Sequence, residues 1–189
     1  MIEQIKQKLE QHHQLYRFPV KGELWEDIFD QVINGNNGDW NMGGHDVGTD
    51  VVSHSDGLRY QNKAGVIDIE KGTLVWSGHR TTKHKTLNEK VEFISENHCD
   101  KYIMLARNKK EWDNGIRRYY LLSFDSDLID YNQLNWEESL SPKNNTISGW
   151  VGKNENLNYS AKIVKSMSDQ LWTEARIDYL GDVTPITIV

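Results

Sequence analysis

The order in which helix-like and strand-like patterns follow one another constrains the fold of this chain most strongly. Apolar residues at helical spacing predict an opening helix within 2–16 and a second amphipathic helix over Glu23–Ile33. The stretch that follows, residues 34–44, is rich in Asn and Gly, which predicts a loop. Thr86 and Glu89 have the spacing of a capping box and predict the start of a third helix.

Short runs with strand character fill most of the remaining chain. They are Gly48–His54, Leu58–Ala64, Ile67–Trp76 with a turn at Lys71-Gly72, Tyr102–Arg107, Arg118–Phe124 and Tyr159–Val164. The pattern of Ser168–Tyr179 is compatible with either helix or strand. Helices and strands in this order predict an α/β fold with a mixed sheet flanked by helices.

Length, charge and cysteine content narrow the class of protein. The 189 residues suit one domain, and a net charge of −6 argues against a general polyanion binder but permits a local basic strip. The single cysteine, Cys99, excludes an intrachain disulfide and a two-cysteine zinc site, and predicts a buried thiol. No apolar run approaches the roughly 18 residues of a membrane span, and the start shows no secretory signal, so we expect a cytoplasmic protein.

One hairpin brings chemically useful residues together. If Asp56-Gly57 forms a two-residue turn, Val52 pairs with Gln61 and Asp50 pairs with Lys63. Strand side chains alternate with a period of two, so Asp50, Gln61 and Lys63 would share one face of the sheet. A three-residue loop would break this register.

A carboxylate, an amide oxygen and an ammonium group in this arrangement suit metal-assisted phosphodiester hydrolysis. Carboxylate and amide oxygens are hard ligands for Mg²⁺, and a bound metal activates water. The ammonium group of Lys63 can orient that water and stabilise charge on the phosphate. The alternative is an ordinary cross-strand pair of Asp and Lys beside a polar Gln, which contributes little energy.

This hairpin resembles the PD-(D/E)XK nuclease superfamily, in its Mrr-like branch with a Gln-x-Lys motif. The residues that carry the resemblance are Gly43, Gly44, Asp46, Gly48 and Asp50, then Gln61 and Lys63, preceded by Trp25–Phe29, which is similar to the first core helix of that branch. They span Glu23–Lys63, about a fifth of the chain. The resemblance implies a restriction-endonuclease-like core.

The resemblance also implies roles for individual residues. Asp50, Gln61 and Glu26 would bind Mg²⁺, and together with Lys63 they would form the catalytic set. Glu23 is the rival of Glu26 as the supporting acid. The chain departs from the family pattern at Thr49, where a proline is usual, and at Gln61, which lacks a carboxylate charge; Asp46 could add a ligand or cap the loop.

The basic run after the third strand-like segment is the expected site of DNA binding. Its residues are His79, Arg80, Thr81, Thr82, Lys83, His84 and Lys85, directly before the predicted helix at Thr86. Side chains of these types donate hydrogen bonds to phosphates and guanine edges, and a helix start adds backbone amides. The alternative is a solvated loop.

The combined hypothesis is a single endonuclease domain over 1–189. Its catalytic core would span about 22–125, with 126–189 completing the sheet or the surface for DNA or a second subunit. By the resemblance it would be a Mg²⁺-dependent type II restriction enzyme, a homodimer that cuts double-stranded DNA, with a cognate DNA methyltransferase and no membrane partner. The alternatives are a repair, junction-resolving or modification-dependent nuclease of the same fold, and a non-catalytic module that binds carbohydrate or DNA.

Overall fold

A computed structural model of the protein describes residues 1–35, 49–96 and 98–188. The strands are β1 (Val51–Val52), β2 (Arg59–Asp68), β3 (Thr73–Arg80), β4 (Lys101–Arg107), β5 (Arg118–Asp125), β6 (Asn135–Leu140), β7 (Ile147–Lys153), β8 (Tyr159–Val164), β9 (Gln170–Arg176) and β10 (Thr184–Thr187). The α-helices are α1 (Ile2–Leu15), α2 (Gly22–Asn34), α3 (Leu87–Ser95), α4 (Lys109–Asp113) and α5 (Ile177–Leu180). Short 3₁₀ turns lie at Ser126–Leu128, Tyr131–Gln133 and Lys165–Met167.

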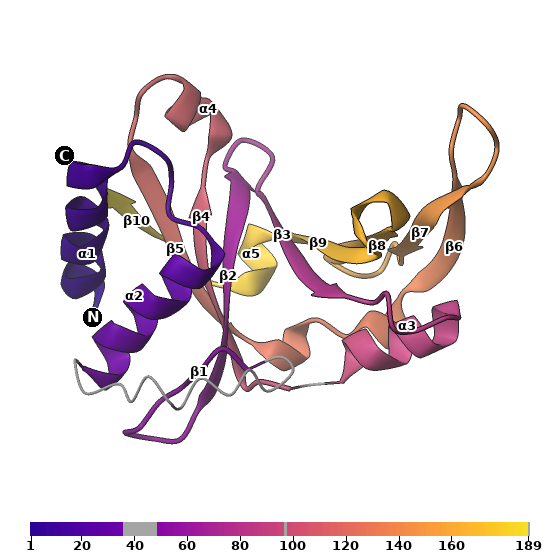
Figure 1. The fold of residues 1–189 in the computed structure, drawn as a ribbon, viewed down its shortest axis with the longest axis horizontal. Coiled ribbons are helices and arrows are strands. Elements are labelled where there is room, and N and C mark those ends of the chain that lie inside the picture. The colour runs from indigo at the N-terminus through magenta and orange to yellow at the C-terminus, as the bar shows by residue number, and fades with distance from the viewer. Residues whose placement is uncertain (36–48, 97, 189) are drawn as a thin grey trace.

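The strands form one mixed sheet of ten strands (Figure 1). Their order is β10-β5-β4-β2-β3-β9-β8-β7-β6, and the short β1 pairs with β2 outside this path. β2 and β4 are parallel, whereas the other neighbouring strands of the sheet pair in antiparallel fashion. The predicted α/β class with a mixed sheet flanked by helices is therefore confirmed. The strands after residue 126 belong to this same sheet.

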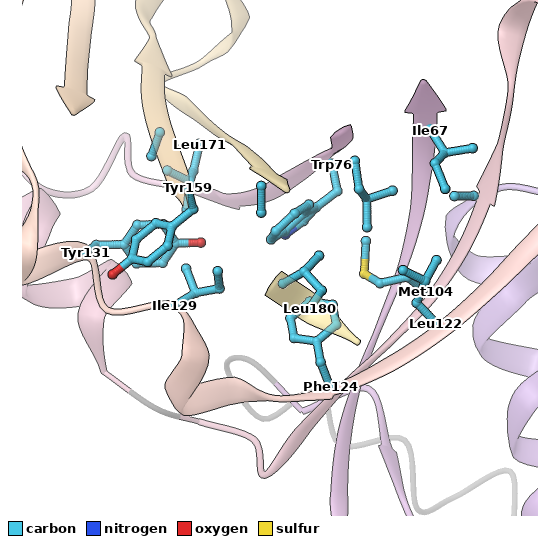
Figure 2. Close-up of a cluster of buried hydrophobic side chains, with 14 of the residues drawn as sticks. Ile67, Trp76, Met104, Leu122, Phe124, Ile129, Tyr131, Tyr159, Leu171 and Leu180 are labelled. Carbon is cyan, nitrogen blue, oxygen red and sulfur yellow. The ribbon is translucent and has the colours of Figure 1, made fainter. Parts of the chain in front are cut away.

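Two hydrophobic clusters lie on opposite faces of the central strands. β4 divides between them, because Ile103 and Leu105 enter the cluster under α1 and α2, whereas Met104 and Ala106 enter the other. A strand buried on both faces reads as a continuous apolar run, which is the pattern that predicted it. The second cluster also holds Trp76 and extends through β5 to β9 and α5 (Figure 2).

The sheet divides into two branches at its centre. The ladder between β2 and β3 covers only Gly65–Asp68 and Thr73–Trp76. Beyond it, residues 60–64 of β2 stay paired with β4, whereas residues 77–80 of β3 pair with β9. Figure 1 shows the two strands diverging below their hairpin. We call the opening between residues 61–64 and 77–80 the fork.

Most sequence-based elements are confirmed, and the exceptions lie where local pattern is weak. The helices at α1, α2 and α3 are confirmed, and α3 has its full capping box between Thr86 and Glu89. The undecided segment Ser168–Tyr179 forms β9 and most of α5. The sequence patterns did not reveal β6, β7, β10 and α4. The predicted loop 34–44 falls almost wholly outside the described residues.

None of the helices in the described ranges has the length and apolar character needed to cross a lipid bilayer.

Candidate active site in the fork of the sheet

Asp50 and Lys63 form an ion pair at the fork. Oδ2 of Asp50 lies 2.9 Å from Nζ of Lys63 and also accepts the backbone N–H of Asn62 at 2.8 Å. Their side chains are 16% and 18% exposed, so the pair is shielded from water but reachable. Asp50 stands just before β1, and its own N–H donates to the carbonyl of Tyr60. The predicted proximity of these two side chains is therefore present.

The register that brings them together differs from the predicted one. Val51 pairs with Tyr60 and Val52 with Arg59, and the N–H of Ser53 donates to the carbonyl of Leu58. The connection is a four-residue loop, 54–57, so the predicted two-residue turn is wrong, as are the pairings of Val52 with Gln61 and of Asp50 with Lys63 that followed from it. The error is a shift of two residues, which leaves each side chain on its expected face because the period is two.

Gln61 is held by a histidine. Its Nε2 lies 3.2 Å from Nε2 of His79, and Gln61 is 3% exposed. Burial, with smaller contributions from the charges of Lys63 and His98, lowers the pKa of His79 to about 4. The imidazole is therefore neutral near pH 7 and accepts the amide N–H of Gln61. Within the described residues, no hydrogen bond joins Gln61 to Asp50.

Behind Gln61 lies a small cavity. Its volume is about 10 Å³, and His79, His98 and Cys99 contribute to its wall. That is the volume that one water molecule requires. Cys99 is buried as predicted, and burial raises the pKa of its thiol to about 11.

A larger groove opens at the fork beside Lys63. Its volume is about 520 Å³, and its polar and charged lining residues are Lys21, Glu26, Asn62, Lys63, Ser77, Arg80, Arg107, Tyr119, Gln170 and the indole of Trp172. Four of these side chains are cations and one is a carboxylate. The groove is therefore locally basic, although the whole chain has a net charge of −6.

Glu26, not Glu23, shares this groove. Glu26 is partly buried on α2 and lines the groove together with Lys63, whereas Glu23 is exposed and is absent from the lining. Helical spacing explains the difference, because Trp25 and Phe29 turn into the core and bring Glu26 toward β2.

The basic segment 79–85 divides into an inner and an outer part. His79 and Thr81 face inward, and the hydroxyl of Thr81 donates to the carbonyl of Asp169. His84 is half-buried and stacks on Phe93. The exposed members are Arg80, Thr82, Lys83 and Lys85, and Arg80 donates to Oε1 of Gln170. Four of the seven predicted DNA-contacting residues thus face solvent.

A buried lysine shapes this segment. Nζ of Lys90 lies 2.9 Å from Oδ2 of Asp169, 2.7 Å from the carbonyl of Thr81 and 2.6 Å from that of His84. Lys90 is 2% exposed. Three acceptors around one ammonium group fix the path of the chain between β3 and α3.

Sequence reasoning missed Lys90, Asn62 and Trp172 as site residues. In the sequence Lys90 resembles any exposed helix lysine, because its partner Asp169 lies 79 residues away. Asn62 stands inside the recognised Gln-Asn-Lys triplet, but its burial is visible only in the folded protein. Gly43, Gly44, Asp46 and Gly48 of the motif lie outside the described residues.

The donor set is compatible with a hard cation that keeps several waters. Within residues 1–35, 49–96 and 98–188, no three His, Cys, Asp or Glu side chains cluster closely enough to form a metal cage. Mg²⁺ seldom uses such a cage and is usually bound by one or two carboxylates plus water and phosphate oxygens. Oδ2 of Asp50 is engaged by Lys63 and Asn62, which leaves Oδ1 as the ligand atom on this residue.

Comparisons of the chain with protein-family models, with curated proteins and with solved structures find no match.

Proposed function

We propose that this protein is a Mg²⁺-dependent DNA endonuclease of the PD-(D/E)XK type, with a restriction-endonuclease-like core. The observation that carries the proposal is the ion pair of 2.9 Å between Asp50 and Lys63 at the edge of a cationic groove. An isolated surface ion pair would not require a groove beside it. The spacing from Asp50 to Gln61 and Lys63 adds the resemblance of the sequence.

Each residue has a stated role in the proposed hydrolysis. Asp50, Glu26 and the amide oxygen of Gln61 would supply the oxygen atoms for Mg²⁺. The metal, when bound, lowers the pKa of a water and neutralises phosphate charge. The ammonium group of Lys63 orients the attacking water and stabilises the negative charge that develops on the phosphate. Arg80, Arg107 and Lys21 bind phosphates of the DNA backbone along the groove.

We further propose a type II restriction enzyme that acts as a homodimer on double-stranded DNA. Two copies related by two-fold symmetry place one centre on each strand of a symmetric site. Protection of the host DNA would then require a cognate methyltransferase. This part of the proposal rests on the resemblance.

The decisive experiment incubates unmodified plasmid with the protein in Mg²⁺ and in EDTA. We expect discrete fragments in Mg²⁺ and none in EDTA, and a loss of at least about 100-fold in rate for Lys63→Ala and for Asp50→Ala. Lys101→Ala is the matched control, because Lys101 pairs with Asp125 on the surface of the adjacent strands. Cleavage by Lys63→Ala at the wild-type rate would falsify the catalytic assignment.

The same assay separates the alternatives. Cutting of branched or methylated DNA alone would indicate a repair, junction-resolving or modification-dependent nuclease. Failure to cut any DNA, with retained binding of DNA or of a glycan, would indicate a non-catalytic module.

A further inference from the structure

Asn62 is a buried polar residue whose amide has no partner. It is 1% exposed, and neither Nδ2 nor Oδ1 makes a hydrogen bond in the described part of the chain. Buried polar atoms are almost always paired, so an unpaired amide requires a specific explanation. Asn62 lines the groove at the fork. A ligand in the groove can supply the missing partners.

A second buried polar group without a hydrogen-bond partner lies on the opposite side of the groove. Trp172 of β9 also lines the groove, and its indole Nε1 is buried with no hydrogen-bond partner among the described residues. Trp172 pairs with Ser77 across the β3–β9 ladder, on the branch of the fork that does not carry Asn62. An aromatic ring and an unpaired amide therefore lie on the two branches of one groove.

The start of α2 supplies an anion-binding end to the same groove. Lys21 precedes the 13-residue helix and makes no side-chain cap, and Lys21 and Gly22 both line the groove. Free backbone N–H groups at a helix start favour anions, and Arg107 adds a cation nearby. The volume of about 520 Å³ lies within the range of roughly 300–1,000 Å³ typical of small-ligand sites.

We propose that the groove holds a single nucleotide of the DNA substrate turned out of its base stack. The base lies between Asn62 and Trp172, and its phosphate lies toward Lys21 and Arg107. The amide of Asn62 presents a donor beside an acceptor, which matches a base edge, and the indole offers a stacking surface. The assignment of this nucleotide to DNA rests on the proposed endonuclease function.

The first experiment measures binding of small ligands to the whole protein by calorimetry. The probes are the four deoxynucleoside 5′-monophosphates and deoxyribose 5-phosphate. We expect at least one nucleotide to bind at least tenfold more tightly than the sugar phosphate. Asn62→Leu and Trp172→Phe should reduce that preference at least fivefold. Trp136→Phe is the matched control, because its indole already donates to the carbonyl of Tyr131.

A thermal melt separates a ligand-binding role of Asn62 from a structural one. Because the amide has no partner to lose, Asn62→Leu should melt at or above the wild-type temperature. Equal affinity of the wild type for all five ligands would overturn the proposal. So would an Asn62→Leu variant with wild-type nucleotide affinity.

The second experiment tests whether the nucleotide in the groove belongs to DNA or is a free nucleotide. Duplexes carry 2-aminopurine at successive positions, with Ca²⁺ in place of Mg²⁺ to prevent cleavage. We expect a fluorescence increase at one position with the wild type, and no such increase with Asn62→Leu. No increase at any position would overturn the extruded nucleotide. Mg²⁺-dependent cleavage would then still support the proposed endonuclease. Nucleotide binding without any cleavage would support the groove as a nucleotide site and would contradict the proposed endonuclease activity.

Discussion

Nζ of Lys90 and Oδ2 of Asp169 form a buried ion pair of 2.9 Å that joins α3 to the turn between β8 and β9. The same ammonium group also holds the carbonyls of Thr81 and His84. The pair therefore links the basic segment 79–85 to the C-terminal branch of the sheet. A buried charge with several acceptors leaves few arrangements open to that segment.

Removal of Lys90 should destabilise the fold markedly. Lys90→Ala leaves Asp169 and two carbonyls without their donor, and breaking a buried pair costs about 3–5 kcal/mol of unfolding free energy. Chemical denaturation measures this cost. Lys101→Ala, in the exposed pair with Asp125, should cost less than about 1 kcal/mol. Equal losses of stability in the two variants would contradict the assigned role of Lys90.

Asp169→Asn tests the charge with the backbone preserved. Asp169 has φ of +49°, and Asn tolerates this left-handed conformation as Asp does. We therefore expect the cost of this variant to come from removal of the charge alone and to be smaller than that of Lys90→Ala. The measurement is again the denaturation midpoint, with the slope as a check on cooperativity.

Lys63→Met should separate metal binding from cleavage. The substitution removes the cation that competes for the carboxylate of Asp50, so Mg²⁺ should bind several-fold more tightly by calorimetry. Cleavage should nevertheless fall at least about 100-fold, because no ammonium group remains to orient the water. Weaker Mg²⁺ binding in this variant would argue against Asp50 as the ligand.

Stability should decline in acid because of His79. Its pKa of about 4 in the folded protein lies below the ordinary 6.5, so between these values only the unfolded chain binds the proton. The contribution of neutral His79 to the free energy of unfolding is complete above pH 6.5. It is lost progressively as the pH falls to 4, and the loss is about 2 kcal/mol for this partly exposed group. Urea denaturation at pH 7, 5.5 and 4 measures it. His79→Phe should show a flatter profile.

Cys99 should resist thiol reagents in the native protein. Burial raises its pKa to about 11, so almost no thiolate exists at pH 8, and the side chain is enclosed. Ellman's reagent should react with Cys99 only after urea is added. Rapid labelling of the native protein would contradict the buried position.

Removal of exposed cations from the basic segment should weaken DNA binding in a salt-dependent way. Arg80→Ala, Lys83→Ala and Lys85→Ala each remove one cation that can neutralise a phosphate. Each variant should therefore reduce the slope of log K against log salt by about 1. Lys71→Ala, in the β2–β3 hairpin loop, is the control. Unchanged slopes in all three variants would remove this segment from the DNA interface.

The hairpin at Asp50 shows how local pattern can succeed for an incomplete reason. Alternation with a period of two placed Asp50 near Lys63 even though the loop has four residues, because the slip was an even number. The same alternation could not reveal that His79 holds Gln61, since that interaction depends on where β3 turns away from β2.

The elements with strong local signals could be predicted from the sequence. Examples are the apolar stripes of α1 and α2, the capping box of α3 and the buried run of β4. Each depends on residues that are close together in the sequence, so each can be recognised there. Four features became visible only in the folded protein: the fork, the groove, the position of Glu26 rather than Glu23 in that groove, and the Lys90–Asp169 pair. Each of these features depends on interactions between residues that are distant in sequence. Such interactions form when the strands pair and the helices pack, and they leave no pattern among neighbouring residues.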